Sequence, residues 1–330
     1  MSGHDEPRPA DDPLPVQDIR EGPDEEYWER LRRLMGPEGL ITYWYLGRAF
    51  NQEVDPDVMG LRPDMRNASG GIMAAPLAIA APETGGWRDR DVVPAPMTYA
   101  LHVLDAAHDV RGIRVTRETV RRGRRIGFSR SLITDVDNPR RVIALTLGTG
   151  ISLGDAPPGF KPVDLPPDLP DTPLPPLTTV FGARRDPDGW RLPELTTRLA
   201  STSASLHLGP IHVVCEAAAS EVAGAAARFG ASNADRGRPE PAPQRGERLQ
   251  VEDWDVQFVA PGRKGPFLVR AEAWHGAQGR LLSRFTLLDE GDADAVVAAG
   301  AATFGLVEQT EHTLAKDAGA VSARGSEATS

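Results

Sequence analysis

The feature that most constrains the fold is a pattern that occurs twice along the chain. Leu206 to Val222 read LHLGPIHVVCEAAASEV, a Gly-Pro turn followed by an apolar helix rich in small residues. Asn67 to Glu83, NASGGIMAAPLAIAAPE, repeat this order of glycine turn and small-residue helix. Proline is tolerated at a helix start, where its missing N–H would have no partner, so Pro210 predicts that the later helix begins near His212. The sequence therefore predicts two related units in one chain.

Each predicted helix is followed by four runs in which apolar and polar residues alternate. Alternation with a period of two is typical of a half-buried β-strand. It is clearest after Phe267, where every second residue is apolar while Arg270 and Glu272 occupy the opposite face. The predicted strands cover residues 97–104, 113–120, 125–136 and 141–150 after the earlier helix, and 249–259, 267–274, 280–288 and 293–304 after the later one. We therefore expect two helix-plus-sheet units and an α+β fold.

The composition narrows the class of protein and of partner. Of the 330 residues, 40% are hydrophobic and 25% are charged, which is ordinary for a soluble globular chain. The 37 basic and 47 acidic side chains give a net charge of −10, which argues against nucleic acid as the main partner. Cys215 is the single cysteine, so an intramolecular disulfide is ruled out. The sequence shows no signal peptide and no membrane-spanning run, so we expect a cytoplasmic protein with no membrane partner.

Shifts in composition predict the domain boundaries. Residues 1–24 are rich in proline and acid and 308–330 are polar, so both are expected to be disordered tails. A linker is expected over 156–179, because nine prolines fall in the 21 residues from Ala156 to Pro176. The first unit then covers 25–155 with a leading helix over Asp24 to Met35, and the second covers 180–307.

A cluster of arginines stands out in a chain of this acidity. Arg121, Arg122, Arg124 and Arg125 bracket Gly123, with the spacing of a hairpin turn between two predicted strands. Guanidinium groups suit phosphate oxygens, whereas runs of charge are also common on solvated turns. Both interpretations, a phosphate site and a solvated turn, stay open from the sequence.

Each unit resembles the hotdog fold of acyl-CoA thioesterases, and the chain resembles a double hotdog in which two antiparallel sheets each wrap around a central helix. The run GGIMAA at 70–75 is similar to the helix start of the acyl-CoA thioesterase II group, and PPGF at 157–160 to its linker. The run GPIH at 209–212, with Glu221 nine residues after His212, resembles the phenylacetate-pathway (PaaI-like) pattern.

The resemblance implies a site between the two units. In the first unit the asparagine of the family falls on Asn67, its histidine on Met73 and its acid on Pro82, with Glu83 one position late. In the second unit His212 and Glu221 keep the histidine and the acid.

One composite site is therefore implied. Glu221 would be the general base or nucleophile, Asn67 would assist it, and His212 would either orient the thioester or cap the turn. The backbone amides of Ala74 and Val213, at the two helix starts, would hold the oxyanion.

The function implied by the resemblance is hydrolysis of an acyl-CoA thioester, with the CoA phosphates on the arginine cluster and no cofactor or metal. A homo-oligomer is a possible assembly. Two alternatives remain: a catalytically silent module that binds acyl-CoA or a protein, and an enoyl-CoA hydratase, which GPIHVV also resembles although its acid position holds His207. Cys215 on an apolar helix is expected to be a core residue rather than a nucleophile.

Overall fold

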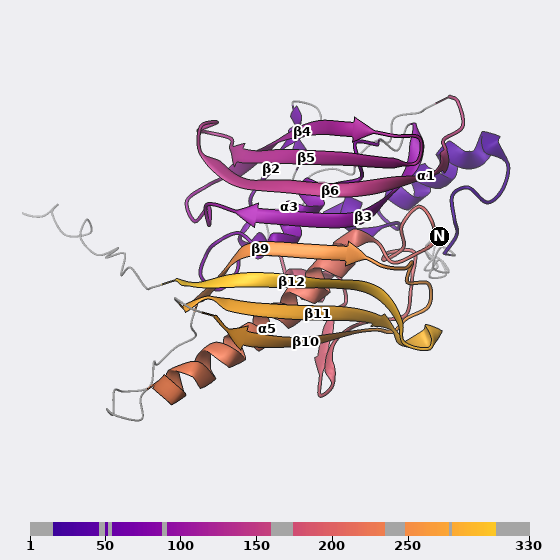
Figure 1. Cartoon of the computed structure of the whole chain (residues 1–330). Coiled ribbons are helices and arrows are strands. Elements are labelled where there is room, and N and C mark those ends of the chain that lie inside the picture. The colour runs from indigo at the N-terminus through magenta and orange to yellow at the C-terminus, as the bar shows by residue number, and fades with distance from the viewer. Residues whose placement is uncertain are drawn as a thin grey trace, which may run out of the picture.

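A computed structural model describes residues 16–45, 50–51, 55–87, 91–159, 174–234, 248–276 and 279–307. Its strands form one 12-stranded sheet in the order β1-β2-β4-β5-β6-β3-β9-β12-β11-β10-β8-β7 (Figure 1). The first half contributes β1 (Phe50–Asn51), β2 (Asp55–Gly60), β3 (Val92–Val103), β4 (Gly112–Arg122), β5 (Ile126–Asp135) and β6 (Val142–Asp155). The second half contributes β7 (Arg184–Asp186), β8 (Gly189–Leu192), β9 (Arg248–Phe258), β10 (Phe267–His275), β11 (Leu281–Asp289) and β12 (Ala295–Val307).

The halves share the sheet because β3 pairs with β9 in antiparallel register. Thr98 lies opposite Gln257 at one end of this pairing and His102 opposite Asp253 at the other. Pairing satisfies the N–H and C=O groups that two free edges would expose. The eight expected strands are present as β3 to β6 and β9 to β12, and the prediction of two sheets is corrected to one continuous antiparallel sheet.

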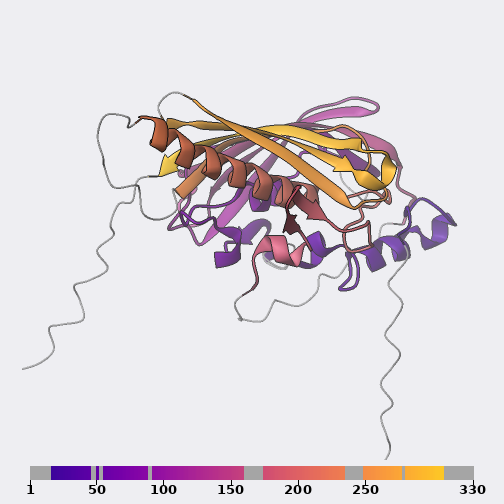
Figure 2. The same ribbon diagram turned by 90° about the horizontal axis from the view of Figure 1, so that it is seen from below.

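Two central helices, α3 (Ala74–Ala80) and α5 (Leu208–Ala234), lie on the same side of the sheet and contact each other (Figure 2). Every residue of α3 is buried, which its small side chains permit. The later helix, α5, begins at Leu208, four residues before its expected start near His212. None of the helices in the described ranges has the length and apolar character needed to cross a membrane.

The N-terminal segment, residues 16–45, packs across both halves. It contains η1 (Asp24–Glu26), α1 (Tyr27–Met35) and α2 (Ile41–Tyr45), so the leading helix is confirmed. The Ile19 amide donates to Thr202 in the second half, while the Arg20 guanidinium donates to the Leu153 carbonyl in the first. Residues 16–24 were predicted to belong to a disordered tail, but Ile19 is buried. Residues 1–15, 308–330 and 160–173 of the predicted tails and linker lie outside the described residues.

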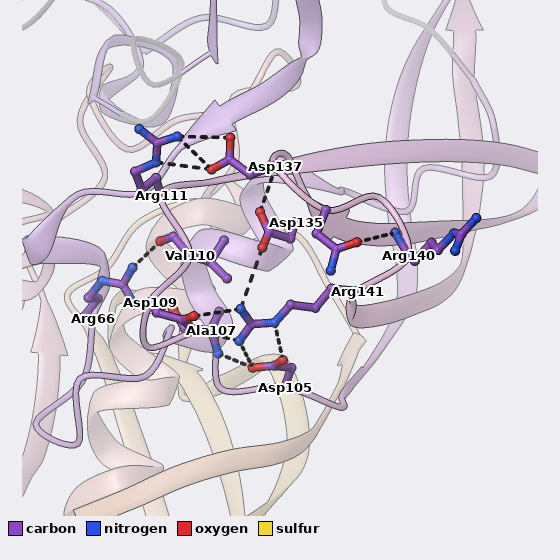
Figure 3. A network of polar contacts seen from close by, with 11 residues as sticks. Arg66, Asp105, Ala107, Asp109, Val110, Arg111, Asp135, Asp137, Arg140 and Arg141 are labelled. Carbon is purple, nitrogen blue, oxygen red and sulfur yellow. Dashed lines mark hydrogen bonds and ion pairs between the residues drawn. The ribbon is translucent and has the colours of Figure 1, made fainter. Parts of the chain in front are cut away.

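A polar network closes one end of the first half (Figure 3). The Arg141 guanidinium donates to Asp105 and Asp109 and also pairs with Asp135 at 3.7 Å. The hydrogen bond from Arg141 to Asp105 lowers the pKa of Asp105 below its usual value. Arg66, from the segment before α3, donates to the carbonyls of Ala107 and Val110 in the same network. The loops around the start of α3 are thereby tied together.

Three further short helices, η3 (Pro63–Met65), α4 (Leu177–Val180) and η5 (Glu290–Asp292), connect these elements.

Candidate active site

A cavity of about 1130 Å³ lies between the two halves, beside the start of α5 and the end of α3. The first half lines it with the segment after α3 and with parts of β3 to β6. The second half lines it with residues between Ser201 and Ile211 and between Phe258 and Arg263. The N-terminal segment supplies a further wall through Arg20, Met35, Thr42 and Tyr43. The cavity is large enough for a small-molecule ligand.

Glu83 brings a carboxylate to this cavity from the segment that follows α3. The side chain is buried, with 2% of its surface exposed. Its Oε1 accepts hydrogen bonds from Ser131 Oγ at 2.8 Å and from Thr146 Oγ1. None of the described residues donates to Oε2, and this oxygen is not sealed from solvent, so it faces the cavity that Glu83 lines. One oxygen is therefore anchored and the other is available to a ligand or a water molecule.

Glycines on the sheet allow the Glu83 segment to lie directly against it. A Cβ on Gly148 of β6 would come within 2.4 Å of the Glu83 Cβ and 2.5 Å of the Thr98 carbonyl oxygen. A Cβ on Gly150 would come within 2.2 Å of the Thr84 backbone. The position of the carboxylate is therefore set by the absence of side chains at two points of β6.

The start of α5 brings hydrogen-bond donors to the same cavity. His207 precedes the helix, and its Nδ1 accepts the Gly209 amide proton at 3.2 Å. The ring proton therefore lies on Nε2, which no described residue accepts and which is not sealed from solvent. Burial lowers the pKa of His207 to about 3, so the imidazole is neutral at physiological pH. The Leu208 amide, at the first position of α5, has no partner within the helix.

The start of α3, by contrast, is occupied by Glu216 of α5. The Ala74 amide donates to Glu216 Oε1 at 2.7 Å and the Ala75 amide to Oε2 at 2.8 Å. Burial raises the pKa of Glu216 to about 7, and the two amides act in the opposite direction. Glu216 does not line the cavity. Sequence reasoning missed this residue, although an acid on a buried, alanine-rich helix was a signal that could have found it.

The residues predicted from the sequence lie apart from one another. Glu221 is 41% exposed and binds Arg185 Nε at 2.8 Å and Trp190 Nε1 at 2.9 Å. His212 is buried, and its Nδ1 accepts the Trp254 Nε1 proton at 3.0 Å. Neither residue lines the cavity. Five residues turn an α-helix by about 500°, so Glu221 points to a different face of α5 from Glu216.

Asn67 and the two predicted oxyanion amides also have other contacts. Asn67 Nδ2 donates to Gln250 Oε1 at 2.9 Å, which links the turn before α3 to β9 of the other half. The Ala74 amide is taken by Glu216. Val213 lies beyond the first turn of α5, so its amide is inside the helix rather than at its start. The structure therefore does not bring Asn67, His212 and Glu221 together.

The arginine cluster forms the predicted hairpin turn between β4 and β5. The Gly123 amide donates to the Ile126 carbonyl at 2.8 Å and closes the turn. All four arginines are exposed and none of them lines the cavity. The Arg122 guanidinium lies over the Trp87 ring, 5.1 Å from its centroid, and Trp87 does line the cavity. The turn therefore lies beside the rim of the cavity.

Solved structures resemble this chain. They include proteins described as thioesterases and one described as having a hot dog fold. An acyl-CoA thioesterase II (TesB2) from Mycobacterium marinum has 12% sequence identity over 78% of this chain and 95% of its own, with a TM-score of 0.47. The TesB protein of Mycobacterium avium subspecies paratuberculosis has 11% identity over 76% and 92%, with a TM-score of 0.44. A conserved protein of unknown function with a hot dog fold from Alicyclobacillus acidocaldarius has 10% identity over 76% and 93%, with a TM-score of 0.44. No protein-family model matches the sequence, and neither does any curated protein.

The contact between Gly148 and Glu83 predicts the effect of one added methyl group. Gly148→Ala should displace Glu83 from its two hydroxyl donors, because the new methyl group would overlap the Glu83 Cβ and the Thr98 carbonyl oxygen. If Glu83 acts in catalysis, a displacement of about 1 Å can lower turnover by about a hundredfold. Gly224→Ala is the control, since a Cβ there meets no atom closer than 3.6 Å. Equal kcat values for the two variants in a steady-state assay would contradict this account of how Glu83 is positioned.

Proposed function

We propose that the protein hydrolyses an acyl-CoA thioester in the cavity between its halves, and that these halves are two fused hotdog units. The observation that carries this proposal is Glu83, a buried carboxylate with one oxygen held by Ser131 and Thr146 and the other facing a cavity of about 1130 Å³. A carboxylate positioned in this way can act as a general base for water. The start of α5 supplies donors in the same cavity.

The proposed reaction uses groups that line one space. Glu83 Oε2 takes a proton from water while the water oxygen attacks the thioester carbonyl carbon. The resulting oxyanion receives hydrogen bonds from His207 Nε2–H and from the Leu208 amide, and a neutral imidazole is a suitable donor for this role. The C–S bond then breaks, and the proton held by Glu83 passes to the departing thiolate. The products are a carboxylic acid and free CoA.

The proposed site is still composite, with the roles of the halves reversed from the sequence prediction. The acid comes from the first half and the helix start from the second, because the other helix start is taken by Glu216. The enoyl-CoA hydratase alternative depends on His212 as a substrate-facing residue. His212 lies in a buried contact with Trp254 and Tyr99, which does not favour that function.

Hydrolysis is tested by release of free thiol from a panel of acyl-CoA thioesters with the purified full-length protein. A rate of thiol release that rises with enzyme concentration and exceeds the rate of spontaneous hydrolysis in buffer supports the proposal. If acyl-CoA binds with a measurable Kd and no thioester in the panel is hydrolysed, the silent binding module takes the place of the enzyme.

We further propose that the arginine cluster in the turn between β4 and β5 binds the phosphates of CoA. Arg122→Ala combined with Arg124→Ala should raise KM for an acyl-CoA several-fold and leave kcat nearly unchanged, because charge-assisted contacts to phosphate act in binding. Added salt should reduce this difference by screening exposed charges. Arg140→Ala is the matched control, since this exposed arginine lies in the turn at the opposite end of β5. An unchanged KM in the double variant would mean that the turn is only solvated.

A further inference from the structure

Three serine hydroxyls converge on the cavity from the loop that precedes α5. Ser201, Ser203 and Ser205, here called the serine loop, all line the cavity. Their Oγ atoms lie 3.1 Å apart between 201 and 203, 3.0 Å between 201 and 205, and 3.1 Å between 203 and 205. Every second residue of this loop is therefore a serine whose hydroxyl lies within hydrogen-bond distance of the other two.

The backbone of the serine loop holds this convergence. Ala204 has a φ of +51°, in the left-handed region that residues other than glycine rarely adopt. The Ser201 amide donates to the Ser205 carbonyl at 2.6 Å and the Ala204 amide to the Ser201 carbonyl at 3.1 Å. A bridge between Ala200 and Leu206 closes the base of the loop. Backbone hydrogen bonds therefore hold most of the conformation, and the Ser201 hydroxyl adds one contact by accepting the Ser203 amide proton at 3.3 Å.

The three hydroxyls can form hydrogen bonds to a ligand in addition to those among themselves. Each serine has one O–H donor and two acceptor lone pairs. In a ring of three, each hydroxyl donates to the next. Ser201 Oγ also accepts the Ser203 amide proton at 3.3 Å, so the lone pairs left for an O–H or N–H of a ligand are those of Ser203 and Ser205. The hydroxyls can also rotate and donate to a ligand oxygen.

The position of the serine loop relates it to the reaction proposed above. Ser205 is two residues before His207, whose Nε2–H is proposed to bind the thioester carbonyl oxygen. Atoms near the serine loop would therefore be those a few bonds from that carbonyl. Both the first carbons of the acyl group and the nearest amide of the pantetheine arm satisfy this condition.

We propose that the serine loop is a subsite for a hydrogen-bonding group, a hydroxyl or an amide N–H, that lies within a few bonds of the thioester. The proposal rests on the proposed function for its placement of the thioester. The group could belong to a hydroxylated acyl chain or to the pantetheine arm, which offer the same chemistry. A long, unsubstituted alkyl chain would leave the three hydroxyls with no partner in the ligand.

The test measures binding, so that it does not depend on turnover. Kd values for β-hydroxybutyryl-CoA and butyryl-CoA are determined by calorimetry on the Glu83→Gln protein, with and without the triple change Ser201→Ala, Ser203→Ala and Ser205→Ala. Loss of one hydrogen bond, worth about 0.5 to 1.5 kcal/mol, should weaken binding by about two- to twelvefold. Weakening confined to β-hydroxybutyryl-CoA assigns the subsite to the acyl group, and equal weakening of both assigns it to the pantetheine arm.

Two further measurements keep the proposal falsifiable. Ser203→Ala alone decides the result if the triple variant does not fold, and Ser220→Ala, on α5 and outside the cavity lining, is the matched control. Kd values within twofold of the parent for both thioesters, with Tm unchanged, would overturn the subsite. Absence of hydrolysis by the wild-type protein would defeat the proposed reaction, and the binding comparison would still decide whether the serine loop contacts the ligand.

Discussion

Glu83→Gln is expected to lower kcat for acyl-CoA hydrolysis by about a hundredfold or more, with little change in Tm. Glutamine has nearly the same shape, and its carbonyl oxygen can still accept the Ser131 and Thr146 protons. Its amide nitrogen cannot take a proton from water, so the base is removed while the cavity is kept. A steady-state assay of thiol release measures kcat, and a thermal melt measures Tm.

The comparison with Glu221→Gln decides between two assignments of the base. The family resemblance assigns the base to Glu221 and so predicts a loss of about a hundredfold or more in turnover for Glu221→Gln. The exposed ion pair of Glu221 with Arg185 instead predicts activity within about twofold of the wild type. Each variant changes one carboxylate to one amide, so the pair is chemically matched. Full activity in Glu83→Gln would exclude Glu83 as the base, whatever Glu221→Gln does.

Glu216→Ala is expected to be strongly destabilising, by about 2 to 4 kcal/mol in the free energy of unfolding. The buried amides of Ala74 and Ala75 would both lose their acceptor, and a cavity would remain between α3 and α5. Denaturant titration measures this loss. A change below about 0.5 kcal/mol would mean that water replaces the carboxylate at no cost.

The same residue predicts a pH dependence with a defined sign. Burial raises the pKa of Glu216 from 4.5 to about 7 in the folded protein, so the folded state binds more protons than the unfolded state between these values. The associated stability, on the order of 3 kcal/mol, is present below pH 4.5 and is lost as pH rises through about 7. Glu216→Gln does not titrate, so its unfolding free energy should fall less than that of the wild type between pH 5 and 8. Parallel pH profiles for the two proteins would contradict the raised pKa.

Local sequence pattern was sufficient to predict the strands and the hairpin turn. Alternation located β3 to β6 and β9 to β12, and glycine within a run of arginines located the turn between β4 and β5. These features depend on neighbouring residues and on backbone conformation. The single sheet could not be read in the same way, because the pairing of β3 with β9 joins residues about 155 positions apart.

The site was harder to predict because it depends on which face of a helix meets which neighbour. The resemblance assigned the acid to Glu221 because it lies nine residues after His212. The packing of α5 on α3 instead brings Glu216 to the Ala74 amide. Glu83 fell one position from the expected acid. Its segment leaves α3 after Ala80, so its direction depends on contacts with Gly148 and Gly150 rather than on helical spacing.

Glu216 binds the amides at the start of α3, whereas the start of α5 lines the cavity. This difference bears on how such a chain can evolve. In a dimer of identical subunits, each substitution appears at both symmetry-related sites, so neither site can be altered alone. In the fused arrangement proposed above, the two helix starts are encoded by separate codons, so a mutation at the start of α3 leaves the start of α5 unchanged. The Glu216 carboxylate, which binds the Ala74 and Ala75 amides, is a difference between the two halves that a symmetric dimer of one subunit could not acquire.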